Sequence, residues 1–266
     1  MLASEPERDV TPPDIVLDVA AGRSTRAVWE NEIGGLTFEI SREPDRVFVK
    51  WYPSNERWRL DAEAVRLLWA VQFTAVPELV DAGADATGAW LVTRALQGDS
   101  AVSTHWKQEP RTAVQAIGAG LRALHDALPV TSCPFSWSAN ARVDDARKRA
   151  GDERLDPRQW HEIHRHLTID DALRAVAEPP STDRLVVCHG DACAPNTLLS
   201  ADGHCSGHVD LDSLGVADAW ADLAVATWSA EWNYGAGWEP TLLDGYRIDP
   251  DPERSSYYRL LWDLGP

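Results

Sequence analysis

The segment from Val187 to Asn196 constrains the fold of this chain more than any other. It follows an apolar run, Leu185–Val187, and leads into a second one, Thr197–Leu199. Short strands are therefore predicted on both sides of a loop. That loop carries the carboxylate of Asp191 and the carboxamide of Asn196. The rest of the fold must therefore support two polar groups at one place.

A second acid follows a few residues later. The turn sequence at residues 201–203 predicts a hairpin whose second strand delivers Asp210 to the same loop, fourteen residues past Asn196. In a set of this kind, one acid accepts the proton of a hydroxyl group and the other two side chains hold Mg²⁺. Asp212 lies beside them, either as a further acid near the metal or as a cap of the hairpin.

An earlier strand carries a lysine among apolar residues. In Arg46–Tyr52 both faces are apolar, which predicts a strand that is covered on both sides. Lys50 shares one face with Phe48, and such a lysine needs an anion because lysine is almost never fully buried without a partner. The alternative is a lysine whose stem packs while its amine reaches water.

A helix predicted over Trp58–Val71 offers that anion. Its apolar residues repeat at intervals of three and four, which places them on one stripe. The stripe consists of Leu60, Ala64, Leu67, Leu68 and Val71. Glu63 lies next to this stripe and would face Lys50 if the helix packs on the strand; a solvated helix glutamate is the alternative.

The other elements follow from the same patterns, and Gly98 marks a hinge. Strands are predicted at Asp14–Ala20, Arg26–Glu32, Leu36–Ser41, Val76–Asp81 and Trp90–Ala95, and helices at Arg111–Leu128, Ala219–Tyr234, Pro240–Tyr246, Pro252–Leu264 and within residues 144–177. The sum is an α+β, two-lobed fold. An N-terminal antiparallel sheet lobe (residues 1–97) is expected to anchor nucleotide phosphates. A larger, mainly helical lobe (residues 98–266) is expected to hold the catalytic hairpin and the substrate site.

Charge and cysteine content narrow the partners. The formal net charge of −17 argues against nucleic acid, because phosphate backbones attract basic patches. It suits a small cationic substrate, and general solubility explains it equally well. No apolar run reaches the roughly 18 residues of a membrane span, and the N-terminus shows no signal pattern. The four cysteines lack paired spacing, so free thiols in the cytoplasm are expected rather than zinc.

Two clusters leave alternatives open. Trp160–His166 holds three of the eight histidines, but their spacing builds no closed tetrahedral metal set with nearby cysteines, and a solvated helix face is favoured. The late tryptophans are expected to be core residues or to line part of a ligand site. They are Trp220, Trp228, Trp232, Trp238 and Trp262.

Together, five residues meet the requirements of phosphoryl transfer to an alcohol. The reaction needs a cation on the phosphates, an acid that fixes this cation, an acid near the acceptor hydroxyl, and metal ligands. In chain order these are Lys50, Glu63, Asp191, Asn196 and Asp210. Each motif alone occurs by chance, whereas the ordered set is much more specific.

Several segments around these residues resemble a known family. Cys188–Asn196, Leu214–Asp218 and Ala221–Ala224 closely resemble the aminoglycoside O-phosphotransferases, in particular the 3′- and 3″-enzymes. Further matches extend the resemblance over most of the chain. They are Trp90–Thr93, Ala123–His125, Cys133–Phe135 and Tyr257–Leu261.

The resemblance implies a protein-kinase-like fold and an ATP (or GTP) cofactor with Mg²⁺. Asp191 would be the catalytic base, Asn196 and Asp210 the metal ligands, and Lys50 with Glu63 the phosphate-anchoring pair. The remaining residues expected to contact the nucleotide are Arg94 and Leu96, through backbone at the adenine, and Ser24 and Thr25 in a reduced phosphate loop. Those expected to pair with ammonium groups of the substrate are Glu162, Glu231, Asp263 and Asp156.

Two departures from the family bear on the substrate. After the second strand the family usually reads Asp-x-Gly-Arg, whereas here Asp212 and Ser213 replace the glycine and arginine. The C-terminal tail keeps only one acid, Asp263. We therefore hypothesise an ATP- and Mg²⁺-dependent kinase of an aminoglycoside hydroxyl, giving antibiotic resistance, as a monomer or weak dimer. The alternatives are a kinase of another small alcohol (a macrolide, a peptide antibiotic or a metabolite) and a non-catalytic pseudokinase, against which the complete catalytic set argues.

Overall fold

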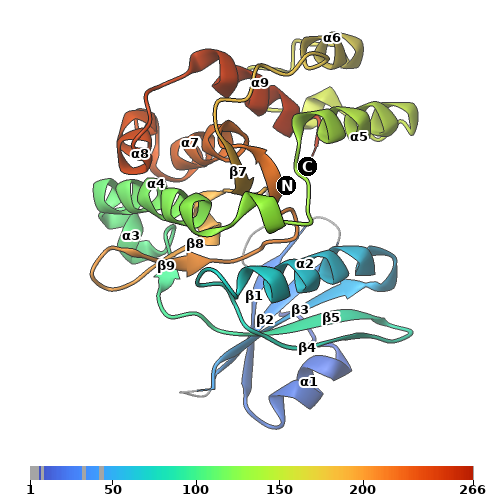
Figure 1. The fold of residues 1–266 in the computed structure, drawn as a ribbon. Coiled ribbons are helices and arrows are strands. Elements are labelled where there is room, and N and C mark those ends of the chain that lie inside the picture. Colours follow the sequence, from blue (N-terminus) through green and yellow to red (C-terminus); the bar gives the residue numbers. More distant parts are fainter. Residues whose placement is uncertain (1–5, 7–8, 32–33, 42–44, 266) are drawn as a thin grey trace. The chain divides into compact units, whose positions relative to one another are not determined.

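The chain divides into two compact units, Met1–Leu96 (unit 1) and Gln97–Pro266 (unit 2). The computed structural model describes residues 6, 9–31, 34–41 and 45–265. The predicted α+β class is confirmed, because unit 1 is built on an antiparallel sheet and unit 2 is mainly helical (Figure 1). Glu32, the end of one predicted strand, lies outside the described residues.

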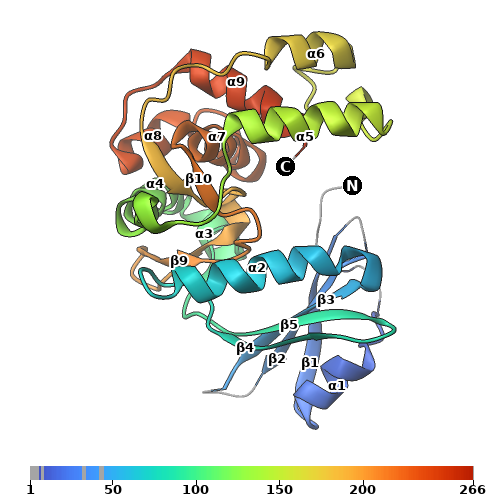
Figure 2. The same ribbon diagram turned by 45° about the vertical axis from the view of Figure 1, so that its right-hand side comes forward.

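Unit 1 is a five-stranded sheet with a helix on each face. The strand order is β1-β2-β3-β5-β4, and each pairing is antiparallel. Helix α1 covers one face and α2 the other (Figures 1 and 2). The elements are α1 (Asp14–Ala20), β1 (Ser24–Glu30), β2 (Leu36–Ser41), β3 (Val47–Pro53), a 3₁₀ turn (Ser54–Glu56), α2 (Arg57–Ala70), β4 (Leu79–Ala84) and β5 (Gly88–Arg94).

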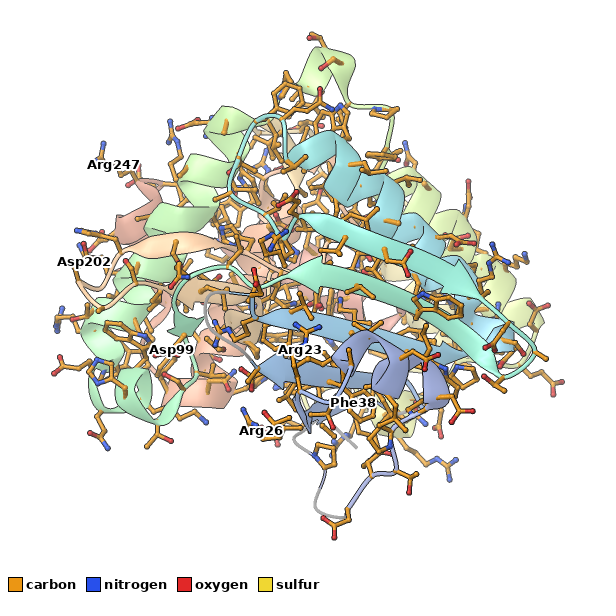
Figure 3. The ribbon with its side chains drawn as sticks, turned by 90° about the horizontal axis from the view of Figure 1, so that it is seen from below. Arg23, Arg26, Phe38, Asp99, Asp202 and Arg247 are labelled. Atoms are coloured by element: carbon orange, nitrogen blue, oxygen red, sulfur yellow. The ribbon has the colours of Figure 1, made fainter. Side chains whose placement is uncertain are left out.

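The strand predicted at Asp14–Ala20 is wrong, because this segment is helix α1. Val16 and Ala20, four residues apart, lie on one helix face and are buried in a cluster with Phe38. Pro13 precedes the first turn, and its carbonyl accepts a hydrogen bond from the nitrogen of Val16 at 2.9 Å. Figure 3 views the sheet from this side and shows Phe38 beside α1. The short apolar run fits the periodicity of a strand as well as that of a helix. Packing against the sheet stabilises the helix.

Helix α2 buries a different stripe from the predicted one. Its buried residues are Leu60, Glu63, Leu67 and Ala70. Leu68 and Val71, predicted on the stripe, are 55% and 44% exposed. The helix is therefore rotated so that Glu63 faces the sheet, which places an acid rather than another apolar residue against β3.

Helix α7 is the centre of unit 2, because each residue from 220 to 230 is buried. Helix α4 packs along α8 at small residues: a Cβ at Gly118 would lie 2.1 Å from the carbonyl oxygen of Leu242. The helices are α3 (Thr104–Gln108), α4 (Pro110–Ala127), α5 (Ala139–Gly151), α6 (Ile169–Ala175), α7 (Trp220–Tyr234), α8 (Glu239–Tyr246) and α9 (Pro252–Asp263), with 3₁₀ turns at Val130–Ser132, Pro157–Gln159 and Ala194–Asn196.

Two short sheets deliver the segments that carry the predicted chemistry. Strand β7 (Leu185–Cys188) pairs with β10 (Gly215–Asp218), and β8 (Thr197–Leu199) pairs with β6 (Asp99–Ser100) and β9 (Cys205–His208). The two strands predicted around the catalytic loop are thus confirmed. Figure 3 labels Asp202 in the turn that joins β8 to β9.

No helix among the described residues is long and apolar enough to cross a membrane. The four cysteines are free thiols, and Cys188 is buried while the others are half-buried. Burial raises the pKa of Cys205 to about 11, so its thiol stays protonated at neutral pH.

Candidate active site

The loop after β7 is fixed by one buried acid of α7. The two carboxylate oxygens of Asp222 accept hydrogen bonds from the backbone nitrogens of His189 (2.6 Å) and Gly190 (2.9 Å). Gly190 has a φ of +88°, and a Cβ there would lie 2.2 Å from the carbonyl oxygen of Ser213. Only glycine satisfies both constraints. The turn that presents Asp191 is therefore held from below by Asp222 and permits no side chain at residue 190.

The charge of Asp222 is stabilised inside the unit. His125 Nε2 lies 2.9 Å from Asp222 Oδ2, and His125 Nδ1 lies 2.8 Å from the hydroxyl of Tyr246. Burial opposes ionisation, but the hydrogen bonds and charge of His125 outweigh it and hold the pKa of Asp222 below its usual value. His125, Cys188 and Asp222 are close enough to hold a cation, but both oxygens of Asp222 already accept backbone N–H groups.

Asp191 has one satisfied oxygen and one that is buried without a partner. Asn196 Nδ2 donates to Asp191 Oδ2 and to the Asp191 carbonyl, both at 3.0 Å. Oδ1 of Asp191 has no hydrogen-bond partner among the described residues. Burial raises the pKa of Asp191, the charge of His189 and a hydrogen bond with the Cys193 thiol oppose this, and the charges of Asp210 and Asp212 add to it. A carboxyl group in this state is suited to accept a proton from a bound hydroxyl group.

Asn196 and Asp210 lie on adjoining backbone. The nitrogen of Val209 donates to the carbonyl of Asn196 at 3.0 Å, and the carbonyl of Val209 lies 2.9 Å from His189 Nε2. Because Asn196 directs Nδ2 at Asp191, its Oδ1 is the atom that can ligate a cation. Asp210 adopts a left-handed backbone (φ +63°), which is uncommon for a residue other than glycine and clusters at functional sites. Carboxylate and amide oxygens are ligands that suit Mg²⁺.

In unit 1, Lys50 and Glu63 form an ion pair. Lys50 Nζ lies 2.7 Å from both Glu63 oxygens, and the two side chains are 18% and 5% exposed. The predicted contact is confirmed, and the alternative of a solvated glutamate is wrong. The nearly buried carboxylate fixes the ammonium group at one position on β3, as the proposed phosphate-anchoring role requires.

The strand register does not support Ser24 and Thr25 as residues near that ammonium group. They pair with Ser41 and Ile40, whereas Lys50 pairs with Thr37, which pairs with Trp29. Trp29 is thus the β1 residue that lies level with Lys50. Ser24 is five residues away from Trp29 along β1, which is about 16 Å at roughly 3.3 Å per residue. This corrects the predicted phosphate loop, which took the wrong end of β1.

The other end of β1 leads into a turn that sequence reasoning missed. Gly35 donates its backbone N–H to Asn31 Oδ1 at 2.7 Å, and Asn31 Nδ2 donates to the Tyr52 hydroxyl at 2.9 Å. Gly34 has a φ of +80°, and a Cβ at Gly35 would lie 2.3 Å from the Tyr52 ring. The Gly34-Gly35 pair was the available signal, because adjacent glycines between two strands predict a tight hairpin turn.

Arg94 and Leu96 lie at the end of β5 and just beyond it. The backbone nitrogen of Arg94 donates to the carbonyl of Glu78 at 2.9 Å, and its guanidinium pairs with the Glu78 carboxylate at 3.2 Å. The carbonyl of Leu96 accepts a hydrogen bond from Arg46 at 3.2 Å. The side chain of Arg94 thus fastens β4 to β5, and the adenine contacts expected from the backbone remain a prediction.

Two of the four predicted substrate acids are engaged within the protein. Asp263 accepts hydrogen bonds from the backbone nitrogen of His161 (3.1 and 3.2 Å), and its Oδ2 lies 2.5 Å from His164 Nδ1. Asp156 binds the Arg158 side chain at 2.7 Å, and hydrogen bonds from Arg158 lower its pKa to about 2. By contrast, Glu162 is exposed and Glu231 half-buried. The substrate contacts expected of all four acids remain a prediction.

The histidine segment is not a solvated helix face, and that prediction is wrong. Residues 160–166 form no helix, since 162–166 are turn, and His164 is 8% exposed. His161 stacks on Trp228, with ring centroids 4.5 Å apart. The charged residues of the segment suit a helix, but the contact of its two inner histidines with α7 and Asp263 stabilises the turns instead.

Comparison with known proteins shows which family the chain resembles. A model of the phosphotransferase enzyme family matches residues 30–258. An aminoglycoside 3′-phosphotransferase of Streptomyces fradiae is 34% identical over 88% of this chain and 92% of its own length. A streptomycin 3″-kinase of Streptomyces griseus is 35% identical over 87% and 89%.

Solved structures show the same fold. An aminoglycoside 3′-phosphotransferase of type VIII superposes with a TM-score of 0.81 and 28% identity, covering 94% of this chain and 98% of that one. A Streptomyces rimosus aminoglycoside phosphotransferase in complex with ADP and streptomycin superposes with a TM-score of 0.73 and 27% identity, covering 94% and 97%. With a family model over most of its length and relatives above 30% identity across nearly all of it, the chain belongs to the phosphotransferase enzyme family.

Proposed function

We propose that the protein transfers the γ-phosphoryl group of ATP, with Mg²⁺, to a 3′- or 3″-hydroxyl of an aminoglycoside antibiotic and so confers resistance to it. The relatives that bear these names match nearly the full chain. The net charge of −17 favours a polycationic acceptor. Because the reaction consumes ATP, we place the enzyme in the cytoplasm, as a monomer or weak dimer.

The observation that carries the proposal is the state of Asp191. Its Oδ2 is held by Asn196, while Oδ1 is buried without a partner. An acceptor hydroxyl that donates to Oδ1 satisfies this atom and loses its proton to it as the phosphoryl group is transferred. Positioning of the hydroxyl and acceptance of its proton are what phosphoryl transfer requires of the protein, since the transition state is loose.

Residues of unit 1 hold the nucleotide phosphates. Lys50 contributes the cation, and Glu63 keeps it in place. The Asn31–Tyr52 hydrogen bond fixes the end of β1 next to β3, the strand that carries Lys50.

Residues of unit 2 hold the metal and the acceptor. Asn196 Oδ1 and the Asp210 carboxylate are the metal ligands, and the oxygen-only donor set fits Mg²⁺. The ion, when bound, neutralises charge that develops on the phosphates. Glu162 and Glu231, which are not engaged in the way Asp263 is, pair with ammonium groups of the acceptor.

Mass spectrometry of products tests this function. After incubation with Mg²⁺-ATP and a mixture of aminoglycosides, one drug class should gain the mass of one phosphate group, and the Asp191→Asn variant should give none. ADP release with a macrolide, a peptide antibiotic or a metabolite, and none with aminoglycosides, would instead establish the kinase of another alcohol. Tight ligand binding without transfer would establish a pseudokinase.

A further inference from the structure

An exposed aromatic surface lies close to the catalytic loop and has no role in the reaction described above. Trp232 is 40% exposed, although tryptophan buries most of its surface on average. It follows Ser229 by three residues on α7, and the Ser229 hydroxyl accepts a hydrogen bond from the backbone nitrogen of Ala194 at 2.8 Å. One helical turn therefore connects Trp232 to the loop that carries Asp191.

Two further rings support this tryptophan. The Trp228 ring lies 5.6 Å from that of Trp232, and the His161 ring lies stacked on Trp228 at 4.5 Å and 6.4 Å from Trp232. Trp228 is 2% exposed and also contacts the guanidinium of Arg259 at 5.4 Å. We call His161, Trp228 and Trp232 the aromatic platform. Trp228 is its buried base, and His161 and Trp232 reach the surface.

Asp263 fixes one side of the aromatic platform. Its carboxylate accepts the backbone N–H of His161 and contacts the ring of His164. The His164 ring in turn lies 5.7 Å from the Trp228 ring. A carboxylate enclosed in this way is a positioning residue, because it holds His161 in place and has its oxygens directed into the protein.

We propose that the aromatic platform binds an aminosugar ring of the acceptor and that Trp232 determines acceptor specificity. This inference rests on the proposed function. A protonated aminosugar combines an apolar ring face, which stacks on indole, with ammonium groups that an aromatic face attracts. Stacking on α7 places this ring within one helical turn of the residue that holds the catalytic loop. The acceptor is thus recognised by the rings, and Asp263 acts on it only through His161.

Steady-state kinetics of Trp232→Ala tests the proposal, with an aminoglycoside that the wild type phosphorylates, such as streptomycin. KM for the aminoglycoside should rise about tenfold, because an exposed or partly desolvated cation–π contact contributes roughly that factor. The kcat value and KM for ATP should stay within twofold, and Trp232→Phe should restore most of the affinity. Trp58→Ala is the matched control, since Trp58 is 58% exposed on α2 and should change neither KM.

The outcomes separate the two proposals. If Trp232→Ala has the thermal unfolding midpoint and the aminoglycoside KM of the wild type, the aromatic platform is refuted and the proposed function stands. If the wild type phosphorylates no aminoglycoside, and calorimetric titration with streptomycin shows no binding, the proposed function is refuted. The proposal that the aromatic platform binds an aminosugar ring is then refuted as well. Trp232→Gln gives the same test should the alanine variant not fold, because it removes the ring and keeps a long side chain.

Discussion

The catalytic loop and the turn at residues 160–166 both contain carboxylates and histidines, but use them differently. At the catalytic loop, Asp222 holds the backbone, so Asp191 keeps an oxygen without a partner. At the turn, Asp263 itself holds the backbone and His164. At the catalytic loop a second acid holds the backbone, which leaves one oxygen of Asp191 for a ligand. The net charge of the chain therefore does not reveal which acids meet the substrate.

The largest effect is expected when the support of the catalytic loop is removed. Asp222→Ala leaves two backbone N–H groups and His125 buried without their partner, so the free energy of unfolding should fall by about 3–5 kcal/mol. Urea denaturation measures the loss, and phosphate transfer measured on the folded fraction should also fall. Asp244→Ala, at an exposed acid of α8, is the control and should lose less than about 0.5 kcal/mol. Equal losses of unfolding free energy in both variants would show that Asp222 has no special role in holding the catalytic loop.

The ion pair of unit 1 should show a large effect on activity. Glu63→Gln removes the charge that fixes Lys50, and kcat/KM for ATP should fall by about 10²-fold, the lower range for loss of one preorganised electrostatic contact. Continuous measurement of ADP release gives the constants. Asp61→Asn, which removes an exposed i,i+4 partner of Arg57 on the same helix, should leave them unchanged. A wild-type kcat/KM for ATP in Glu63→Gln would show that the Lys50–Glu63 ion pair is not needed for the reaction with ATP.

Low pH should weaken the region around the catalytic loop. Burial, with the charge of His189, lowers the pKa of His208 to about 3, whereas an unfolded histidine has a pKa of about 6.5. Below pH 6.5 the unfolded chain binds a proton that the folded chain does not, so stability is complete above that pH and falls as pH drops toward 3. At pH 5 the loss is about 2 kcal/mol, since each unit of pKa difference corresponds to about 1.4 kcal/mol.

Urea unfolding at pH 5 and pH 7.5 checks this contribution. His208→Gln should show a smaller difference between the two pH values than the wild type, because glutamine binds no proton. His105→Gln, on exposed α3, should keep the wild-type difference. If His208→Gln keeps it as well, His208 is not the group responsible.

The smallest expected effect is the change of the aminoglycoside KM in Asp263→Asn. This variant tests most closely whether Asp263 acts on the backbone or on the substrate. Asp263→Asn keeps an oxygen that accepts the His161 N–H, so KM for the aminoglycoside should change less than threefold. Asp263→Ala removes the acceptor and should raise KM about tenfold while lowering the unfolding midpoint. If the asparagine variant loses as much affinity as the alanine variant, the charge of Asp263 contacts the substrate directly.

Local patterns predicted the parts of the site that depend on short-range order. The period-two strand around Lys50 and the nearby helix foretold the Lys50–Glu63 contact, because both elements are regular and packed. Asp191 and Asn196 share one short loop, so their proximity follows from chain connectivity alone.

The features that sequence patterns did not predict are those that depend on tertiary contacts. Asp14–Ala20 is too short for its period to separate helix from strand, and the sheet selects the helix. Ser24 and Thr25 were misplaced because strand register depends on pairing partners that no local pattern reveals. The structural role of Asp222 was not foreseen, since its partners at residues 189 and 190 are more than thirty positions away. The contact of Asp263 with His164 was not foreseen, because it spans 99 residues.

Single-turnover kinetics of Asp191→Asn test the central claim most directly. With an aminoglycoside that the wild type phosphorylates, the rate of phosphate transfer should fall by at least about 10³-fold, because base and hydroxyl positioning are lost together. The dissociation constant of Mg²⁺-ATP should stay within about twofold, since Lys50 and the metal ligands remain. A transfer rate near that of the wild type would contradict the assignment of Asp191 as the proton acceptor.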